Sequence, residues 1–127
     1  MLEVDIPEVL AELVASFDAY ERALIDNDIE TLNALFWASP LTTRYGTRDA
    51  ERQYGQAEIA AFRRRRGVID QRRVLRNRRI TTLGRDFGIA NTEFLPAGSD
   101  KVGRQSQTWM RTAEGWKIVS AHVSFGL

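Results

Sequence analysis

The feature that most restricts the fold is a series of four β-type segments in the second half of the chain. Residues 73–83, 87–95, 102–111 and 115–125 are rich in β-branched, aromatic and alternating polar side chains. Connections containing typical turn residues separate them, such as Gly84-Arg85-Asp86 and the loop at residues 96–100. Because links this short join neighbouring antiparallel strands, the sequence predicts a four-stranded meander.

The first half of the chain is predicted to be mainly helical. Apolar residues at helical spacing indicate a first helix from about residue 7 to residue 27, with Pro7 in its first turn. Asp28 suits the N-cap of a second, short helix, which Ser39-Pro40 ends. Residues 41–45 and 51–54 are predicted to form a short hairpin, and residues 55–66 a third helix that stops at Gly67.

This order of elements indicates the fold class. Helices followed by a run of antiparallel strands predict an α+β domain, with about three N-terminal helices packed on one face of a curved, mostly antiparallel sheet. The 127 residues suit a single domain, residues 1–127, with a substantial hydrophobic core. A curved sheet that wraps over helices leaves a cone-shaped cavity, which is the default ligand site.

Composition excludes several kinds of chemistry. The chain has no cysteine and one histidine, so disulfides, thiol nucleophiles and multi-histidine metal sites are excluded, and no acidic cluster suggests a carboxylate metal site. No apolar run approaches the roughly 20 residues that span a bilayer. Residues 1–5 lack the basic start and apolar core of a signal peptide, so a cytoplasmic location without membrane association is expected.

The net charge of +1 hides a strong asymmetry along the chain. Residues 3–30 hold nine acidic residues and one arginine, whereas residues 63–79 hold nine arginines and one acid, Asp70. A nucleic-acid surface is one interpretation. No nucleic-acid motif accompanies the run, which favours solvated arginines that face acidic surface on the same chain or on a partner subunit.

Several motifs in combination resemble those of a known family. They include Arg44-Tyr45-Gly46, the strand motif Gly103-Arg104-Gln105-Ser106-Gln107-Thr108-Trp109, and Ala121-His122-Val123-Ser124. Together they resemble the AtzH-like family, which includes the oxalurate-catabolism protein HpxZ and lies within the nuclear transport factor 2-like (SnoaL-like) superfamily. The resemblance covers nearly the whole chain and implies the cone-shaped fold of that superfamily.

The resemblance also implies a function. It suggests a cofactor-free enzyme of ureide and nitrogen catabolism that acts on a small carboxylated urea, dicarboxyurea-like or oxalurate-related, by decarboxylation or hydrolysis. Tyr20 and Arg44 match the positions implicated in the family's chemistry. A homodimer that pairs through the outer faces of its sheets is implied as well. The alternative is a non-catalytic module with the same fold that binds a carboxylated metabolite or accompanies a partner amidase.

Tyr20 and Arg44 are the two candidate catalytic residues, each for a different physical reason. Tyr20 lies on the apolar stripe of the first predicted helix, so it points inward and its hydroxyl needs a partner. The Arg44 guanidinium, in a predicted strand, could hold a substrate carboxylate in two hydrogen bonds. Tyr45, the next residue in that strand, is a candidate for substrate binding. The alternatives are a core tyrosine with its hydroxyl at the rim and an ordinary surface arginine.

The remaining substrate-binding candidates lie on the third helix and the last two strands. Arg63 begins a run of four arginines, some of which must face solvent, and a solvated helix end is the favoured alternative to a binding role for it. One face of the strand at residues 102–111 carries Gln105, Gln107 and Trp109, and this face is predicted to line the cavity. The alternative is that these polar residues form a hydrated dimer interface. His122 is a natural proton carrier but is more often structural in a strand. Glu93 could also face inward, which would raise the pKa of its carboxyl, but an exposed or paired glutamate is the favoured interpretation.

Overall fold

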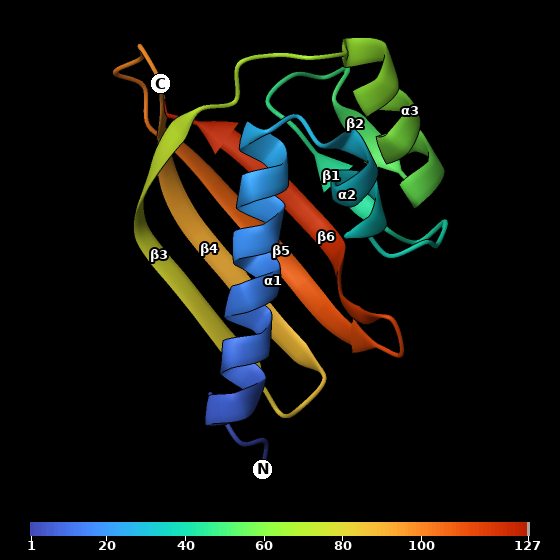
Figure 1. Ribbon diagram of the computed structural model, residues 1–127, viewed down its shortest axis with the longest axis vertical. Helices are drawn as coiled ribbons and strands as arrows, with labels where there is room; N and C mark the ends of the chain where they lie inside the picture. Colours follow the sequence, from blue (N-terminus) through green and yellow to red (C-terminus); the bar gives the residue numbers. More distant parts are fainter. Residues whose placement is uncertain (127) are drawn as a thin grey trace.

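A computed structural model describes residues 1–126, which form three helices and one curved six-stranded sheet (Figure 1). The helices are α1 (Pro7–Ile25), α2 (Ile29–Ala34) and α3 (Gln56–Arg66). The strands are β1 (Thr43–Tyr45), β2 (Arg52–Tyr54), β3 (Arg73–Leu83), β4 (Phe87–Pro96), β5 (Gly103–Thr112) and β6 (Gly115–Phe125). The predicted α+β class, with helices ahead of a curved sheet, is confirmed.

The helix boundaries follow from local chemistry that the sequence carries. Pro7 occupies the first turn of α1, where its missing N–H costs nothing. The Asp28 carboxylate accepts a hydrogen bond from the backbone N–H of Thr31 at 3.2 Å and so caps α2, as predicted. Gly67 ends α3 with a φ of 70°, a conformation that glycine adopts without strain.

One sheet contains both the short hairpin and the four-stranded meander, although nothing in the sequence indicated that the two would pair. The strand order is β2-β1-β6-β5-β4-β3, so the meander β3–β6 is extended by the short β1–β2 hairpin. Strand β1 runs parallel to β6, which places Arg44 opposite Ala121 and Tyr45 opposite His122. A bulge in β3 between Arg76 and Arg79, with Asn77 at a φ of 55°, bends the sheet edge over α1.

Helix α1 lies across the concave face of the sheet (Figure 1), and the core lies between the two. From α1 it takes Val9, Leu13, Phe17, Tyr20 and Leu24, and from the sheet it takes Ala90, Trp109, Trp116, Ile118 and Ala121. Leu13, Phe17, Tyr20 and Leu24 match the predicted apolar stripe of the first helix, and the sheet positions match the alternation of the strands. Val9 takes the place of the predicted Leu10 and Val14, which are only half-buried. Burial of this face fixes the distance between α1 and the sheet.

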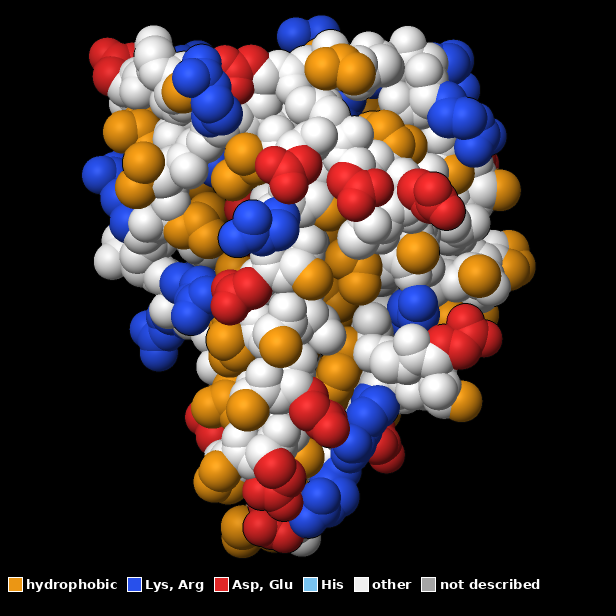
Figure 2. Space-filling view, viewed as in Figure 1, with side chains coloured by type: hydrophobic (Ala, Val, Ile, Leu, Met, Phe, Trp, Pro, Cys, Tyr) orange, Lys and Arg blue, Asp and Glu red, His pale blue; other side chains and the backbone are white. Residues whose placement is uncertain are grey.

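The charge asymmetry of the sequence becomes a contact between α1 and β3. The Arg78 guanidinium lies 2.9 Å from the carboxylate of Asp18, and Arg73 forms an ion pair with Glu21. Figure 2 shows acidic side chains along the front of the molecule, where α1 runs, with basic side chains beside them. Acidic residues of the N-terminal segment therefore face arginines of the basic segment on the same chain.

No helix within residues 1–126 is both long and apolar enough to cross a membrane.

Candidate functional site

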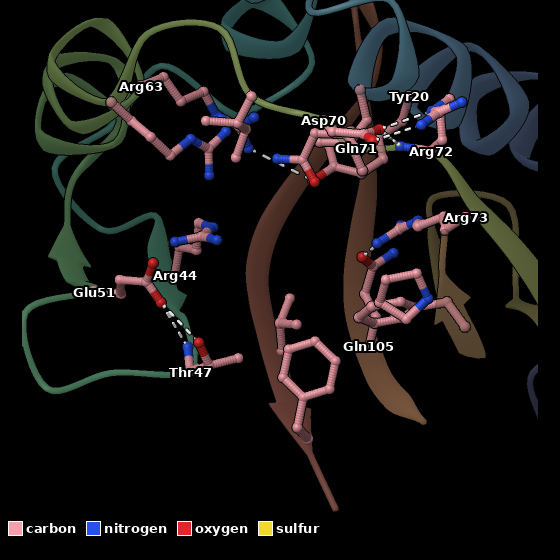
Figure 3. Close-up of a pocket in the computed structure, with 17 residues that line it drawn as sticks. Tyr20, Arg44, Thr47, Glu51, Arg63, Asp70, Gln71, Arg72, Arg73 and Gln105 are labelled. Atoms are coloured by element: carbon pink, nitrogen blue, oxygen red, sulfur yellow. Dashed lines mark hydrogen bonds and ion pairs between the residues drawn. The ribbon is translucent and has the colours of Figure 1, made fainter. Parts of the chain in front are cut away.

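A cavity of about 270 Å³ lies at the wide end of the cone, beside the C-terminal half of α1. Its lining comes from α1, β1, α3, the segment between α3 and β3, and the neighbouring ends of the long strands. Figure 3 shows Arg44, Arg63 and Glu51 on one side and Arg73 with Gln105 on the other. A space of this size suits a small metabolite rather than a polymer.

Arg63 is buried in the cavity wall without a carboxylate partner among the described residues. It is 2% exposed, and its Nε and Nη1 atoms have no hydrogen-bond partner there. Its guanidinium lies 5.4 Å from the centre of the Phe36 ring, and Nη2 lies 3.5 Å from the hydroxyl oxygen of Tyr20. A buried cation with unpaired N–H groups is costly, so an anion in the cavity would stabilise it.

Tyr20 presents a hydroxyl to the same space. Its ring is 5% exposed and packs edge-on against Phe36, with ring centres 6.2 Å apart. Since an arginine N–H can only donate, the long contact with Arg63 uses the Tyr20 oxygen as an acceptor. The Tyr20 proton is then free to be donated to a group in the cavity.

Two further arginines join Arg63 on this wall. Nη1 of Arg44 donates to Oε1 of Gln53 at 3.0 Å, and the guanidiniums of Arg44 and Arg66 lie 5.6 Å and 5.4 Å from the centre of the Phe62 ring. Burial lowers the pKa of Arg44, and the charge of Arg63 lowers it further, against opposing effects of Tyr20 and Glu51. Burial and then the charges of Arg63 and Arg44 lower the pKa of Arg66. We call Arg44, Arg63 and Arg66 the cationic wall.

Glu51 lines the cavity, and its negative charge acts on Arg44 and Arg66 of this wall. Burial raises the pKa of Glu51, but hydrogen bonds from Thr47 and Arg48 and the charge of Arg44 together lower it below its ordinary value. Its Oε2 accepts from the backbone N–H of Thr47 at 2.8 Å and of Arg48 at 3.2 Å. Glu51 is therefore ionised near neutral pH and engaged in its own loop, which leaves the wall with an excess of positive charge.

The opposite wall contains a buried ion pair. Nε of Arg73 donates to Oε2 of Glu21 at 3.0 Å, and Nη2 of Arg73 donates to both Glu21 and Oε1 of Gln105, the latter at 3.0 Å. The side chains of Arg73 and Glu21 are 6% and 9% exposed. The guanidinium also stacks on Phe94, 4.4 Å from the ring centre. Arg73 is thus neutralised within the protein, unlike Arg63.

The mouth of the cavity is formed by the segment between α3 and β3. Asn27, at a φ of 55°, holds it through two hydrogen bonds to Ile69: Nδ2 donates to the carbonyl at 2.8 Å, and Oδ1 accepts from the N–H at 3.1 Å. Asp70 and Arg72 form an exposed ion pair at the rim. Side-chain and backbone hydrogen bonds from Arg72 lower the pKa of Asp70 to about 2.

Part of the lining is apolar. Leu24, Phe94, Val123 and Phe125 line the cavity, and the Phe94 and Phe125 rings pack edge-on with centres 5.6 Å apart. A Cβ at Gly103 would lie 2.2 Å from the Phe94 ring, so glycine is needed there to let the ring sit at this wall. The cavity therefore has a charged side and an apolar side.

The structure brings together four of the eight predicted site residues. Tyr20, Arg44, Arg63 and Gln105 all line the cavity. Gln107 and Trp109 share the inward face with Gln105 but lie deeper in the core, where Nε1 of Trp109 donates to Oε1 of Gln107 at 3.0 Å.

The other predicted residues lie on the outer face of the sheet. Tyr45 and His122 face each other across β1 and β6, with ring centres 5.6 Å apart, and neither lines the cavity. They point outward because Arg44 and Ala121, their chain neighbours, point inward. Their predicted roles in substrate binding have no geometric support from this cavity.

The inward orientation considered for Glu93 is wrong. Its neighbours Thr92 and Phe94 are buried, so Glu93 takes the outer face, where it accepts hydrogen bonds from Asn77 at 2.7 Å and Arg104 at 3.2 Å. These two hydrogen bonds lower the pKa of Glu93 instead of raising it.

Sequence reasoning missed several lining residues, chiefly Glu51, Arg66 and Arg73, and also Glu21, which pairs with Arg73 from outside the lining. The signal that could have found the Glu21–Arg73 pair is the charge asymmetry, because it implied acid–arginine contacts between residues 3–30 and 63–79. Arg66 follows Arg63 by three positions and therefore lies on the same helix face.

Fold and cavity together describe a domain with the cone-shaped fold of nuclear transport factor 2-like proteins and a cationic pocket at the wide end of the cone. A nuclear transport factor 2-like protein from Streptomyces avermitilis, described as a putative dehydratase, has a TM-score of 0.78 at 17% identity, covering 94% of this chain and 97% of its own. At this identity the similarity shows the fold alone.

The chain belongs to the AtzH-like family, whose model matches residues 2–126. A protein of unknown function from Pectobacterium atrosepticum is 48% identical, with a TM-score of 0.93 and coverage of 98% of this chain and 95% of its own. A cystatin-like fold protein from Burkholderia xenovorans is 47% identical, with a TM-score of 0.91 and coverage of 98% and 97%. No curated protein is significantly similar to the chain.

Proposed function

We propose that this protein is a cofactor-free enzyme of ureide and nitrogen catabolism that acts on a small carboxylated urea, as the oxalurate-catabolism proteins of the HpxZ type within its family suggest. The observation that carries the proposal is the buried, unpaired guanidinium of Arg63 beside the hydroxyl of Tyr20. A carboxylate is the natural counter-ion for such a group, since arginine binds carboxylates through paired hydrogen bonds.

The cationic wall supports an anionic substrate more strongly than any single arginine does. Arg44, Arg63 and Arg66 repel one another in the apo protein, which contributes to the lowered pKa of Arg44 and Arg66. A bound carboxylate would relieve this repulsion and bring a negative charge to the guanidinium of Arg63, which has no carboxylate partner among the described residues. Such an interaction is strong because the site is partly removed from water.

The two sides of the cavity suit decarboxylation of a substrate with two carboxylates. Loss of carbon dioxide breaks the N–C bond, leaves the electron pair on nitrogen and turns an anionic carboxylate into a neutral molecule. An arginine on the departing carboxylate would therefore stabilise the ground state and slow the reaction. We assign the carboxylate that stays to the cationic wall and the one that leaves to the apolar side, near Phe94 and Val123.

Tyr20 is assigned the proton that this reaction requires. As the N–C bond breaks, the nitrogen gains negative charge, and a donor aimed at it lowers the barrier. General acid help of this kind contributes about 100- to 10,000-fold to a rate. Water would return the proton to the tyrosine oxygen after product release. Hydrolysis would begin with the same recognition of the carboxylated nitrogen.

The test is a panel of ureides, including dicarboxyurea and oxalurate, assayed separately for carbon dioxide and ammonia. The wild type should consume at least one of them. Tyr20→Phe should lower kcat about 100-fold or more with little change in KM, because it removes only the donated proton. Arg44→Met should raise KM about tenfold or more. Full activity in both variants would refute the assignment.

Tight, saturable binding of a ureide without turnover would favour the alternative, a ligand-binding module or a companion of an amidase.

The homodimer is a proposal of its own. Its supporting observation is the exposed outer sheet face, where the Tyr45 and Tyr54 hydroxyls lie 3.2 Å apart and Phe87 is 50% exposed. Size-exclusion chromatography with light scattering should give twice the chain mass of 14.5 kDa.

A further inference from the structure

We propose that the buried Glu21–Arg73 ion pair is a positioning device that fixes the Gln105 amide with its NH2 group toward the cavity. Gln105 would then read a hydrogen-bond acceptor on the ligand, opposite the cationic wall. This inference rests on the proposed function only in placing an anionic metabolite in the cavity. It adds Glu21 and Arg73 to the residues on which recognition depends.

The first step is the orientation of the amide. The Gln105 side-chain oxygen lies 3.0 Å from Nη2 of Arg73, and arginine nitrogens carry hydrogens and cannot accept. The amide atom that faces Arg73 must therefore be the oxygen. The flipped amide would set two donors against each other in a buried place, which is costly. Figure 3 shows this contact on the wall opposite Arg44 and Arg63.

The nitrogen of the same amide has no partner within the chain that the structure describes. Nε2 of Gln105 is buried and has no hydrogen-bond partner among the described residues, although the residue is only 3% exposed and lines the cavity. Native proteins rarely leave a buried N–H2 group unpaired. A carboxylate or carbonyl oxygen of a ligand would complete its hydrogen bonding.

Arg73 is held in place by two further contacts and cannot rotate away from Gln105. Two of its nitrogens are held by the Glu21 carboxylate in a bidentate pair, and its plane stacks on Phe94. The exposed fractions of 6% and 9% leave little water to compete for these hydrogen bonds. Glu21, on α1, thus acts on the ligand site through Arg73 and Gln105 without touching the ligand.

The test of the amide orientation uses malonate, a small dicarboxylate that can only accept hydrogen bonds, in isothermal titration with Gln105→Glu and Gln105→Met. The glutamate keeps an oxygen for Arg73 but places a second oxygen where the NH2 group was. We expect Gln105→Met to weaken malonate about tenfold and Gln105→Glu about 100-fold, because a donor is replaced by a repelling acceptor. Equal affinity of Gln105→Glu and wild type would overturn the orientation.

A double-mutant cycle tests the positioning role of the ion pair. The double variant Glu21→Met/Arg73→Met replaces the pair by apolar side chains, which buried ion pairs often tolerate with little loss of stability. We expect it to weaken malonate about tenfold when Gln105 is present and less than twofold in the Gln105→Met background. An equal loss in both backgrounds would mean that Arg73 contacts the ligand or that the fold is damaged, and would overturn the proposal.

Ureide turnover separates this inference from the proposed function. If ureides are consumed but the Gln105 variants keep wild-type kcat and KM and bind malonate normally, the positioning proposal fails while the enzyme assignment stands. If no ureide is consumed but malonate binding depends on Gln105 as described, the positioning proposal stands and the substrate class is wrong. Failure of wild type to bind malonate would overturn the positioning proposal.

Discussion

Arg73 and Arg63 lie on opposite walls of one cavity and are both almost inaccessible to solvent, yet their surroundings differ. Arg73 is paired with the Glu21 carboxylate, a glutamine oxygen and an aromatic ring. Arg63 has an aromatic ring and a long contact to a hydroxyl, and two of its nitrogens have no partner among the described residues. One buried arginine is satisfied by the fold, and the other is not.

This difference separates a structural charge from a binding charge. Burying a cation is favourable only when hydrogen bonds and an opposite charge compensate the loss of water. For Arg73 the chain supplies that compensation from α1. For Arg63 the compensation must come from outside the chain, which is the physical reason to place a substrate anion there.

The largest effect is expected from breaking the satisfied pair. Arg73→Met should lower the free energy of unfolding by about 3–5 kcal/mol, because it leaves the Glu21 carboxylate buried without its partner. Urea denaturation followed by circular dichroism measures this change. The matched control is Glu21→Met/Arg73→Met, which should recover most of the loss. If Arg73→Met is as stable as wild type, the Glu21–Arg73 ion pair does not contribute to the stability of the fold.

The opposite sign is expected at the unsatisfied arginine. Arg63→Met should raise the free energy of unfolding of the apo protein by about 1–3 kcal/mol, since it removes a buried group with unmet hydrogen bonds and a source of repulsion toward Arg44 and Arg66. The same urea titration, without added anions, tests it. A marked loss of stability would mean that Arg63 is held by the fold after all.

A smaller effect is expected at the segment that joins the helix of Arg63 to the strand of Arg73. Asn27→Ala should cost about 1–2 kcal/mol, because it removes both hydrogen bonds to Ile69 and forces alanine into a positive φ. Asn27→Gly loses only the hydrogen bonds and serves as the control. Hydrogen exchange of the amides at residues 67–72 should quicken in both variants. Unchanged exchange would show that Asn27 does not hold the cavity mouth.

The smallest effect concerns Glu51, the partial counter-ion of Arg44. Its pKa is lowered in the folded protein, so its stabilising contribution is fully present above the ordinary value of 4.5 and is lost as pH falls through the lower folded value. The stability difference between wild type and Glu51→Gln should therefore be greatest above about pH 4.5 and shrink on acidification. Thermal unfolding between pH 3 and pH 7 checks this, and a difference that grows toward low pH would contradict it.

Local chemistry made much of the fold predictable. The Asp28 cap, the stop at Gly67, the apolar stripe of α1 and the alternation of β5 are encoded by neighbouring residues, so Gln105 could be placed on the inward face. The parallel pairing of β1 with β6 joins residues 77 positions apart, and no local pattern indicates it.

The site was less predictable for the same reason. A run of four arginines does not by itself indicate which of them lie on the buried face of the helix. In the structure Arg63 and Arg66 face inward, whereas Arg64 and Arg65 are exposed. Glu21 and Arg73 are separated by 52 positions and meet only because α1 packs across β3. Tyr45 and His122 have side chains that often take part in binding or catalysis. The alternation of side chains along a strand places both of them on the outer face of the sheet.

The most direct test of an anion site at Arg63 is calorimetric titration of malonate into wild type, Arg63→Met and Arg64→Met. Both substitutions remove one positive charge from α3, but Arg64 is exposed and does not line the cavity. One malonate per chain should bind to wild type, with affinity lowered about 10- to 100-fold in Arg63→Met and less than twofold in Arg64→Met. Equal weakening by the two variants, or none by Arg63→Met, would contradict the claim that the cavity holds an anion against this unpaired arginine.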